Sequence, residues 1–171
     1  SNYFNHHQKA LCDEFYAVLK EDFTFVETEP MEEFRSKMGW GQEVIPPYVL
    51  KSHIDEKELK KACFLADESD VVIMGTAPED MIKKRLEDDR LTFRYSERPL
   101  KEGRWKVLVP YLAKKFYVNH YSNRNKKLYL LAAGAFVESD YHFLHSYKNK
   151  CYKFGYFPRE EQKSFEELEK L

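Results

Sequence analysis

The sequence has few cysteines, and their spacing excludes most metal and disulfide frameworks. Its three cysteines, Cys12, Cys63 and Cys151, are widely separated and include no Cys-x-x-Cys pair. Isolated cysteines fit a reducing, intracellular compartment, so we expect a cytoplasmic protein. No apolar run approaches the roughly 20 residues that a membrane-spanning helix needs.

Sequence motifs for phosphate binding, nucleophilic catalysis and metal binding are also missing. The chain has no Gly-x-Gly-x-x-Gly or Walker pattern, and no Gly-x-Ser-x-Gly nucleophile elbow. No Asp-x-Asp follows an expected strand, so we expect no metal site. With 28 Lys and Arg against 29 Asp and Glu, the net charge of −1 favours no nucleic-acid partner.

What the chain does have is an abundance of aromatic residues, 12 Tyr and 13 Phe. Large rings usually fill a hydrophobic core, and flat rings also suit the faces of sugars, so both interpretations stay open. The 171 residues suffice for one sizeable core, and we expect a single folded domain over residues 1–158. Residues 159–171 are acidic and helix-prone, which is typical of a helical tail or the start of an interdomain linker.

Short apolar runs alternate with longer periodic segments. This pattern predicts an α/β, Rossmann-like fold, with an open and mostly parallel sheet covered by helices on both faces. The expected strands are residues 23–26, 48–53, 70–74, 91–95, 128–131 and 151–154. The expected helices are residues 6–19, 31–37, 55–66, 79–86, 102–121, with Pro110 as a kink or break, and a last one that ends near residue 147.

The expected order of elements lacks a strand before the first helix, where only residues 1–4 are found. We expect this first strand to be truncated, or reduced to an extended segment at residues 2–4.

Ligands of open parallel sheets bind at the carboxyl ends of the strands, which here are followed by residues 2–8, 75–79, 95–98 and 132–140. His6 and His7 lie at the predicted start of the first helix, where the helix dipole favours a neutral imidazole that can exchange a proton near pH 7. They are equally well read as a capping or surface pair. Asn5 is the candidate N-cap and a candidate ligand contact.

The other three segments supply candidate substrate-binding residues, each with a structural alternative. Gly75 and Thr76 precede an expected helix and can present N–H groups to an anion, or form an ordinary turn. Glu97 and Arg98 can bind sugar hydroxyls or form a structural ion pair with each other. Ser139 and Asp140 can contact a substrate or cap the helix in which they lie.

Several pieces of the chain resemble one family of proteins. The segments that carry the resemblance are residues 2–9 (NYFNHHQK), 25–31 (FVETEPM) with 39–41 (GWG), 91–98 (LTFRYSER) and 152–158 (YKFGYFP). Together they resemble the N-terminal domain of bacterial GT-B type glycosyltransferases, over almost the whole chain up to about Pro158.

The resemblance implies an acceptor-side domain that binds a sugar or glycan, facing a C-terminal domain that binds the nucleotide-sugar donor as co-substrate. It implies a glycosyltransferase that needs no metal or other cofactor, with His7 and His6 as the catalytic candidates and this half inactive alone. A membrane is expected as a partner only through the acceptor, at the inner membrane face. The glycine-rich form of the first loop, common in relatives, is absent here.

Two other functions stay open. One is a non-enzymatic α/β module that binds a sugar or a protein. The other is a small flavodoxin-like protein, although residues 75–78 make a poor phosphate loop.

Overall fold

The strands of the protein are short, and helices connect them in regular alternation. The structure, a computed structural model, describes residues 1–40 and 44–157. The strands are β1 (Phe25–Glu27), β2 (Val49–Lys51), β3 (Val72–Met74), β4 (Thr92–Ser96), β5 (Leu128–Ala133) and β6 (Cys151–Phe154). The α-helices are α1 (His6–Leu19), α2 (Glu33–Lys37), α3 (Glu56–Glu68), α4 (Lys83–Glu87), α5 (Pro110–Phe116) and α6 (Val137–Phe143). The 3₁₀ segments are η1 (Lys20–Asp22), η2 (Glu79–Ile82) and η3 (Arg104–Leu108), and η4 (Tyr117–Tyr121) is a π-helical turn.

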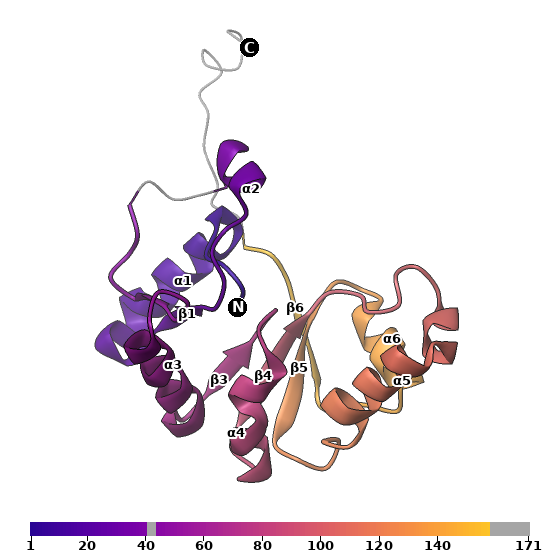
Figure 1. The fold of residues 1–171 in the computed structure, drawn as a ribbon. Coiled ribbons are helices and arrows are strands. Elements are labelled where there is room, and N and C mark those ends of the chain that lie inside the picture. Colours follow the sequence, from indigo (N-terminus) through magenta and orange to yellow (C-terminus); the bar gives the residue numbers. More distant parts are fainter. Residues whose placement is uncertain (41–43, 158–171) are drawn as a thin grey trace, which may run out of the picture.

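All strand pairs that the structure describes are parallel. β1 pairs with β2, with Phe25 opposite Val49, and β3–β4–β5–β6 form a second sheet in chain order. Helices flank these sheets (Figure 1). The α/β, Rossmann-like parallel architecture predicted from the sequence is therefore confirmed.

The first residues of the chain lie between the two sheets. The amino group of Ser1 donates a hydrogen bond to the Val26 carbonyl (3.0 Å), and the N–H of Thr28 donates to the Ser1 carbonyl (3.0 Å). This pattern is the ladder of parallel strands, with Ser1 opposite Glu27. On its other side Ser1 lies against Gly75, just after β3, where an added Cβ would come within 3.3 Å of the Ser1 Oγ. Figure 1 shows the N-terminus between β1 and β3.

Two hydrophobic clusters hold the layers together. One joins alternate residues of β5, Leu128, Leu130 and Ala132, to residues from β3, η2, α4 and α6. The other lies beneath α1, where Phe4 and Cys12 pack with Tyr48. Burial of such side chains is the main driving force for this layered arrangement.

The region between β4 and β5 differs from the prediction. Residues 102–121 were expected to form one long helix, and the structure divides them into η3, α5 and η4. Pro110 is the first residue of α5, because its ring excludes the N–H that an interior helical position would need. Gly103 precedes η3 with φ +120°, a conformation outside any helix.

Other expected elements are confirmed with small changes of boundary. The helix predicted over residues 6–19 and the strand predicted over residues 151–154 are observed with these same boundaries. Asp55 caps α3 as expected, since its side chain accepts a hydrogen bond from the Glu58 N–H. The helix expected over 79–86 begins as η2, and α6 ends at Phe143 rather than near residue 147. Gly41 and the predicted tail at residues 159–171 lie outside the described residues.

Candidate functional site

The candidate site lies where the order of the strands along the chain changes direction. From Ser1 the chain continues to β1 and β2 on one side, and β3 to β6 follow on the other. In open parallel sheets, ligands bind at the carboxyl ends of the strands beside such a reversal. Segments 2–8, 75–79, 95–98 and 132–140 all follow or end strands at this edge, so the candidate residues of the sequence belong to one edge of the fold.

The two histidines lie at this edge in the first turn of α1. Their rings are 3.9 Å apart between centroids, and the Trp40 ring stands edge-on to both, at 5.6 Å from His6 and 5.5 Å from His7. Burial and the neighbouring His6 lower the pKa of His7. A neutral imidazole therefore predominates at pH 7, and a neutral imidazole can accept a proton from a hydroxyl group.

The segment after β6 completes this cluster. The Tyr156 ring lies 6.0 Å from His7 and 6.1 Å from Tyr95 at the end of β4. Its hydroxyl donates a hydrogen bond to the Glu97 carboxylate, and burial together with this bond raises the Tyr156 pKa. We call His6, His7, Trp40, Glu97 and Tyr156 the aromatic rim. In Figure 1 the yellow segment after β6 runs toward the start of α1.

Trp40 and Tyr156 were not among the site residues predicted from the sequence. Each lies beyond the end of a regular element, Trp40 after α2 and Tyr156 after β6. Aromatic residues just after a strand or helix are a signal that sequence reasoning can use, because such positions lie at the ends of regular elements where ligands bind. Their contact with His7 depends on chain segments far apart in sequence.

Asn5 has a structural role. Its side chain accepts a hydrogen bond from the His7 N–H (2.9 Å), and the Gln8 side chain accepts one from the Asn5 N–H (3.1 Å). This reciprocal pair is a capping box, which satisfies N–H groups that the first helical turn leaves free. The predicted N-cap is confirmed, and Asn5, only 6% exposed, holds His6 and His7 at the start of α1.

Arg98 and Asp140 form an ion pair with each other rather than with neighbouring residues. The Arg98 Nε donates to Asp140 Oδ2 at 3.0 Å, and Nη2 donates to Oδ1 at 3.3 Å. The Leu100 N–H also donates to Asp140, which is 1% exposed. The expected ion pair between Glu97 and Arg98 is therefore wrong, because Arg98 pairs with Asp140 and Glu97 accepts a hydrogen bond from the Tyr156 hydroxyl.

The prediction that Ser139 or Asp140 caps α6 is wrong. The helix begins at Val137 after Phe136, so both residues lie inside it. Ser139 instead donates a hydrogen bond from its exposed hydroxyl to the Phe136 carbonyl (3.1 Å). The side chain of Asp140 is held by Arg98, a residue 42 positions earlier in the chain.

Gly75 and Thr76 follow β3, and Thr76 is exposed. The turn that they enter leads into a short 3₁₀ segment, whose Glu79 forms an ion pair with Arg94 of β4 (3.0 Å). Gly75 itself packs against Ser1.

Three further observations bear on the kind of protein and site. Within residues 1–40 and 44–157, no group of three or more His, Cys, Asp or Glu side chains is arranged to hold a metal ion. No helix in the same part of the chain is long and apolar enough to cross a bilayer. Comparison with protein families, curated proteins and solved structures finds no significant match to the chain.

Proposed function

We propose that this chain is the acceptor-binding half of a glycosyltransferase, with the aromatic rim as its sugar-binding site. The observation that carries the proposal is the meeting of His7, Trp40, Glu97 and Tyr156 at the carboxyl edge of the sheet. Aromatic rings pack on the apolar faces of sugars, and carboxylate and phenol groups hydrogen-bond their hydroxyls.

The proposed reaction uses His7 as a general base. Its neutral imidazole takes the proton of the acceptor hydroxyl as that oxygen attacks the anomeric carbon of the donor sugar. The bond between the anomeric carbon and the nucleoside diphosphate breaks, and the diphosphate leaves with the bonding electrons. The groups that stabilise this leaving diphosphate are expected from a donor domain, and the described segment alone is expected to be inactive.

The test is donor-dependent transfer by the protein that carries both halves, measured with a panel of labelled nucleotide sugars. We expect His7→Ala to lower turnover by about 10²-fold, the size of a typical general-base contribution. Lys60→Ala is the matched control, because Lys60 is exposed on α3 and is not a residue of the rim. Wild-type turnover in His7→Ala would remove the histidine from the mechanism.

A non-enzymatic sugar-binding module is the second candidate. The observation in its favour is that Asn5, Arg98 and Asp140 are engaged in structural contacts, which leaves few polar groups for chemistry. Trp40 fluorescence, measured in a Trp105→Phe background and titrated with simple sugars, reports binding by either kind of protein. Binding without transfer to any acceptor by the two-domain protein would favour the module.

A further inference from the structure

One face of the four-stranded sheet is open to solvent. Side chains of a strand point alternately to the two faces of its sheet, and paired residues of parallel strands point to the same face. Ile73 on this face is 44% exposed and Tyr152 is 52% exposed. Of the large side chains that the described strands β3 to β6 place there, only Leu131 is buried. We call this surface the open face, and its residues are Ile73, Phe93, Tyr95, Tyr129, Leu131, Tyr152 and Phe154.

The opposite face of the same sheet is covered. Leu128, Leu130 and Ala132 of β5 point to it and are buried in a cluster with residues of α4 and α6. Parallel sheets occur almost only with both faces covered, because their strands present apolar side chains on each side. The open face therefore lacks the layer that the other face has within the described residues.

The rings of the open face lie side by side. The centroid of the Tyr129 ring is 5.5 Å from that of Phe93 and 6.1 Å from that of Tyr152. Nearer the carboxyl ends of the strands, the rings of Tyr95 and Phe154 are 5.7 Å apart. Together they form one continuous apolar area, whose burial would stabilise the fold.

The chain leaves β6 beside this area. The ring of Tyr156 lies 6.1 Å from that of Tyr95, and the ring of Phe157 lies 5.0 Å from that of Phe154. Phe157 is the last residue that the structure describes. The residues that follow it therefore begin next to the open face.

The sequence of residues 159–171 is typical of an amphipathic helix. Phe165, Leu168 and Leu171 are three residues apart, and every other residue of this tail is charged or polar, mostly Glu, Lys and Gln. We call these three residues the apolar stripe. A helix of this length spans about 20 Å, which matches the length of about 20 Å of a six-residue strand such as β5.

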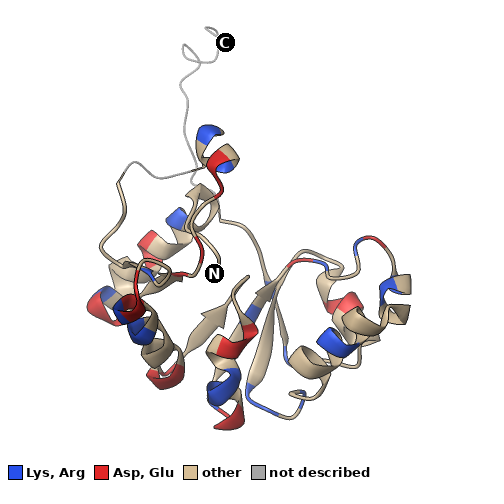
Figure 2. Ribbon diagram, in the orientation of Figure 1, with Lys and Arg blue, Asp and Glu red and all other residues tan. Residues whose placement is uncertain are grey.

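The amino ends of β5 and β6 carry positive charge. Residues 101–127 contain eight of the 28 Lys and Arg and a single acidic residue, Glu102. The Lys150 Nζ lies 5.7 Å from the centre of the Tyr129 ring on the open face. Figure 2 shows basic positions in the loops at the lower end of β5. The basic residues just before β5 and β6 are Arg124, Lys126, Lys127 and Lys150.

We propose that residues 159–171 form an amphipathic helix that packs its apolar stripe on the rings of the open face. A helix that follows a strand runs back toward the amino ends of the strands. Glu167 and Glu169 flank the apolar stripe, so this path brings them toward the basic residues before β5 and β6. Apolar burial and opposite charge thus favour the same arrangement. The inference is independent of the proposed sugar transfer.

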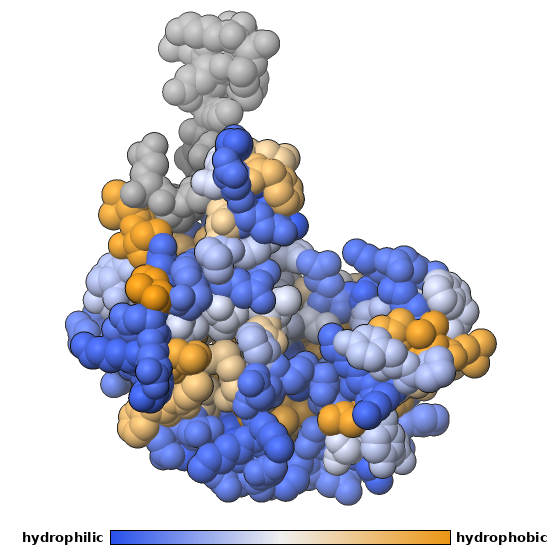
Figure 3. All heavy atoms as spheres, viewed as in Figure 1, coloured by the Kyte–Doolittle hydropathy of each residue, from blue (hydrophilic) through white to orange (hydrophobic). Residues whose placement is uncertain are grey.

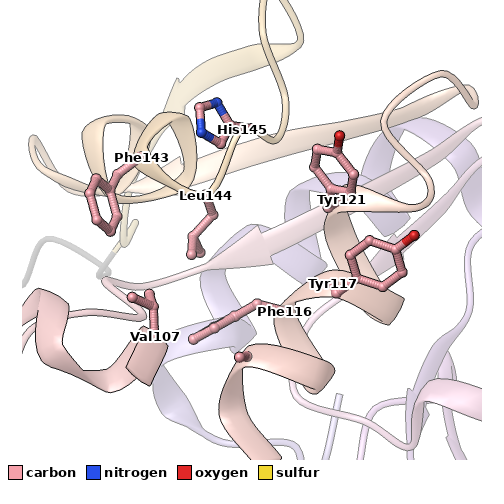
Figure 4. A pocket seen from close by; sticks show the side chains of 8 residues that line it. Val107, Phe116, Tyr117, Tyr121, Phe143, Leu144 and His145 are labelled. Atoms are coloured by element: carbon pink, nitrogen blue, oxygen red, sulfur yellow. The ribbon is translucent and has the colours of Figure 1, made fainter. Parts of the chain in front are cut away.

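Two other apolar areas have no such continuity with the tail. One is the orange patch at the right edge of Figure 3, where Figure 1 places η3 and α5. The other is a groove of about 420 Å³ between α5, η4 and the end of α6, lined in part by Phe116 and Phe143 (Figure 4). The described chain ends elsewhere, with Phe157 against Phe154 on the open face.

The experiment is hydrogen exchange of the whole chain, followed by mass spectrometry of peptides from residues 159–171. We expect these amides to exchange at least about ten-fold more slowly than in the isolated peptide, because helical hydrogen bonds and packing protect them. Phe165→Asp/Leu168→Asp should remove the protection. Lys163→Gln/Lys170→Gln, which makes the same change of net charge on the opposite side of the helix, is the matched control and should keep it.

Substitutions in β6 test where the tail packs. Tyr152→Asp places a charge on the open face and should also remove the protection. Lys153→Gln makes the same change of charge at an exposed neighbour that points to the other face, and should keep it. Exchange of β5 peptides and circular dichroism check that each variant is folded.

Three results would overturn the proposal. The first is an unprotected tail in the wild type, and the second is protection that survives Tyr152→Asp, which would place the tail elsewhere on the molecule. The third is protection that requires a dimer, detected by light scattering over a range of protein concentrations. That result would assign the open face to a second copy of the chain.

Discussion

Two polar clusters at the carboxyl edge of the sheet differ in how their charges are neutralised. In the ion pairs Arg94–Glu79 and Arg98–Asp140, each charged group has a partner of opposite charge, and Arg94 and Asp140 are buried. In the aromatic rim, His6, His7 and Glu97 are exposed, and their neighbours are mostly rings. The first cluster is built to hold the loops in place, and the second has surface available to a ligand.

The comparison predicts that substitutions in the ion pairs lower the stability of the protein, whereas substitutions in the aromatic rim lower ligand binding. Removing one partner of a buried pair leaves the other as an uncompensated buried charge, whereas removing a rim residue exposes little that was buried. The following tests run from the largest expected change in the free energy of unfolding to the smallest.

Glu79→Ala is expected to have the largest effect. It leaves the Arg94 guanidinium, whose side chain is 7% exposed, without its carboxylate. We expect the free energy of unfolding to fall by about 3 kcal/mol, as for other broken buried pairs. Urea denaturation measures the loss, and Glu97→Ala is the matched control, with an expected change below about 0.5 kcal/mol. Equal losses in the two variants would contradict the distinction between the clusters.

Acid should destabilise the protein through His120. Burial is the main cause that lowers the His120 pKa to about 3, with the charges of Arg94 and Lys115 as smaller causes. The unfolded chain, with a histidine pKa near 6.5, therefore binds a proton below this pH and the folded chain does not. Stability is full above pH 6.5 and declines as the pH falls from there toward 3.

The expected loss between pH 7.5 and pH 5 is about 2 kcal/mol, measured by urea denaturation at each pH. His120→Gln keeps a polar group near the Tyr147 hydroxyl and removes the titration. Its stability should change less over this interval than that of the wild type. The same slope in both proteins would show that other groups cause the acid sensitivity.

Asn5→Ala removes the side chain that caps α1. We expect a loss of about 1 kcal/mol in the free energy of unfolding, because the His7 N–H then has no side-chain acceptor. Asn5→Ser, which retains a capping oxygen, should recover most of the loss. A loss in both variants would place the importance of Asn5 elsewhere than in its cap.

The smallest effects on stability are expected in the aromatic rim. His7→Ala and Tyr156→Phe should change the free energy of unfolding by less than about 0.5 kcal/mol, since both side chains are largely exposed. Sugar binding, followed by Trp40 fluorescence, should weaken in both. Unfolding of either variant at room temperature would show that the rim is structural, like the ion pairs.

Local patterns allowed much of the fold to be predicted. The helix at residues 6–19 had a polar cap and an apolar face, and these act within one or two turns of chain. Short runs of β-branched and aromatic residues predicted the parallel strands, because strand propensity also depends on residues that are close in sequence. The region 102–121 was predicted less well, because Gly103 precedes η3 with a positive φ and Pro110 begins the separate helix α5, whereas the apolar periodicity alone would run on through both.

The candidate site could be predicted only in part. Parallel strands bring their carboxyl ends to one edge, so His7 and Glu97 could be assigned to the same edge from sequence. The partners of Asp140 and Tyr156 could not, since Arg98 is 42 residues from the first and Glu97 is 59 residues from the second. No local pattern in a sequence encodes contacts over such separations.

The alternation of strands and helices, the cap of α1 and the basic character of residues 101–127 follow from the order of amino acids alone, because each depends on neighbouring residues. Tertiary structure decided which charges are neutralised and which remain available. Asp140 is a structural group because Arg98 pairs with it, and His7 has Trp40 and Tyr156 as neighbours because the residues after α2 and after β6 lie beside the start of α1. Pairing of this kind depends on how distant segments are brought together in space.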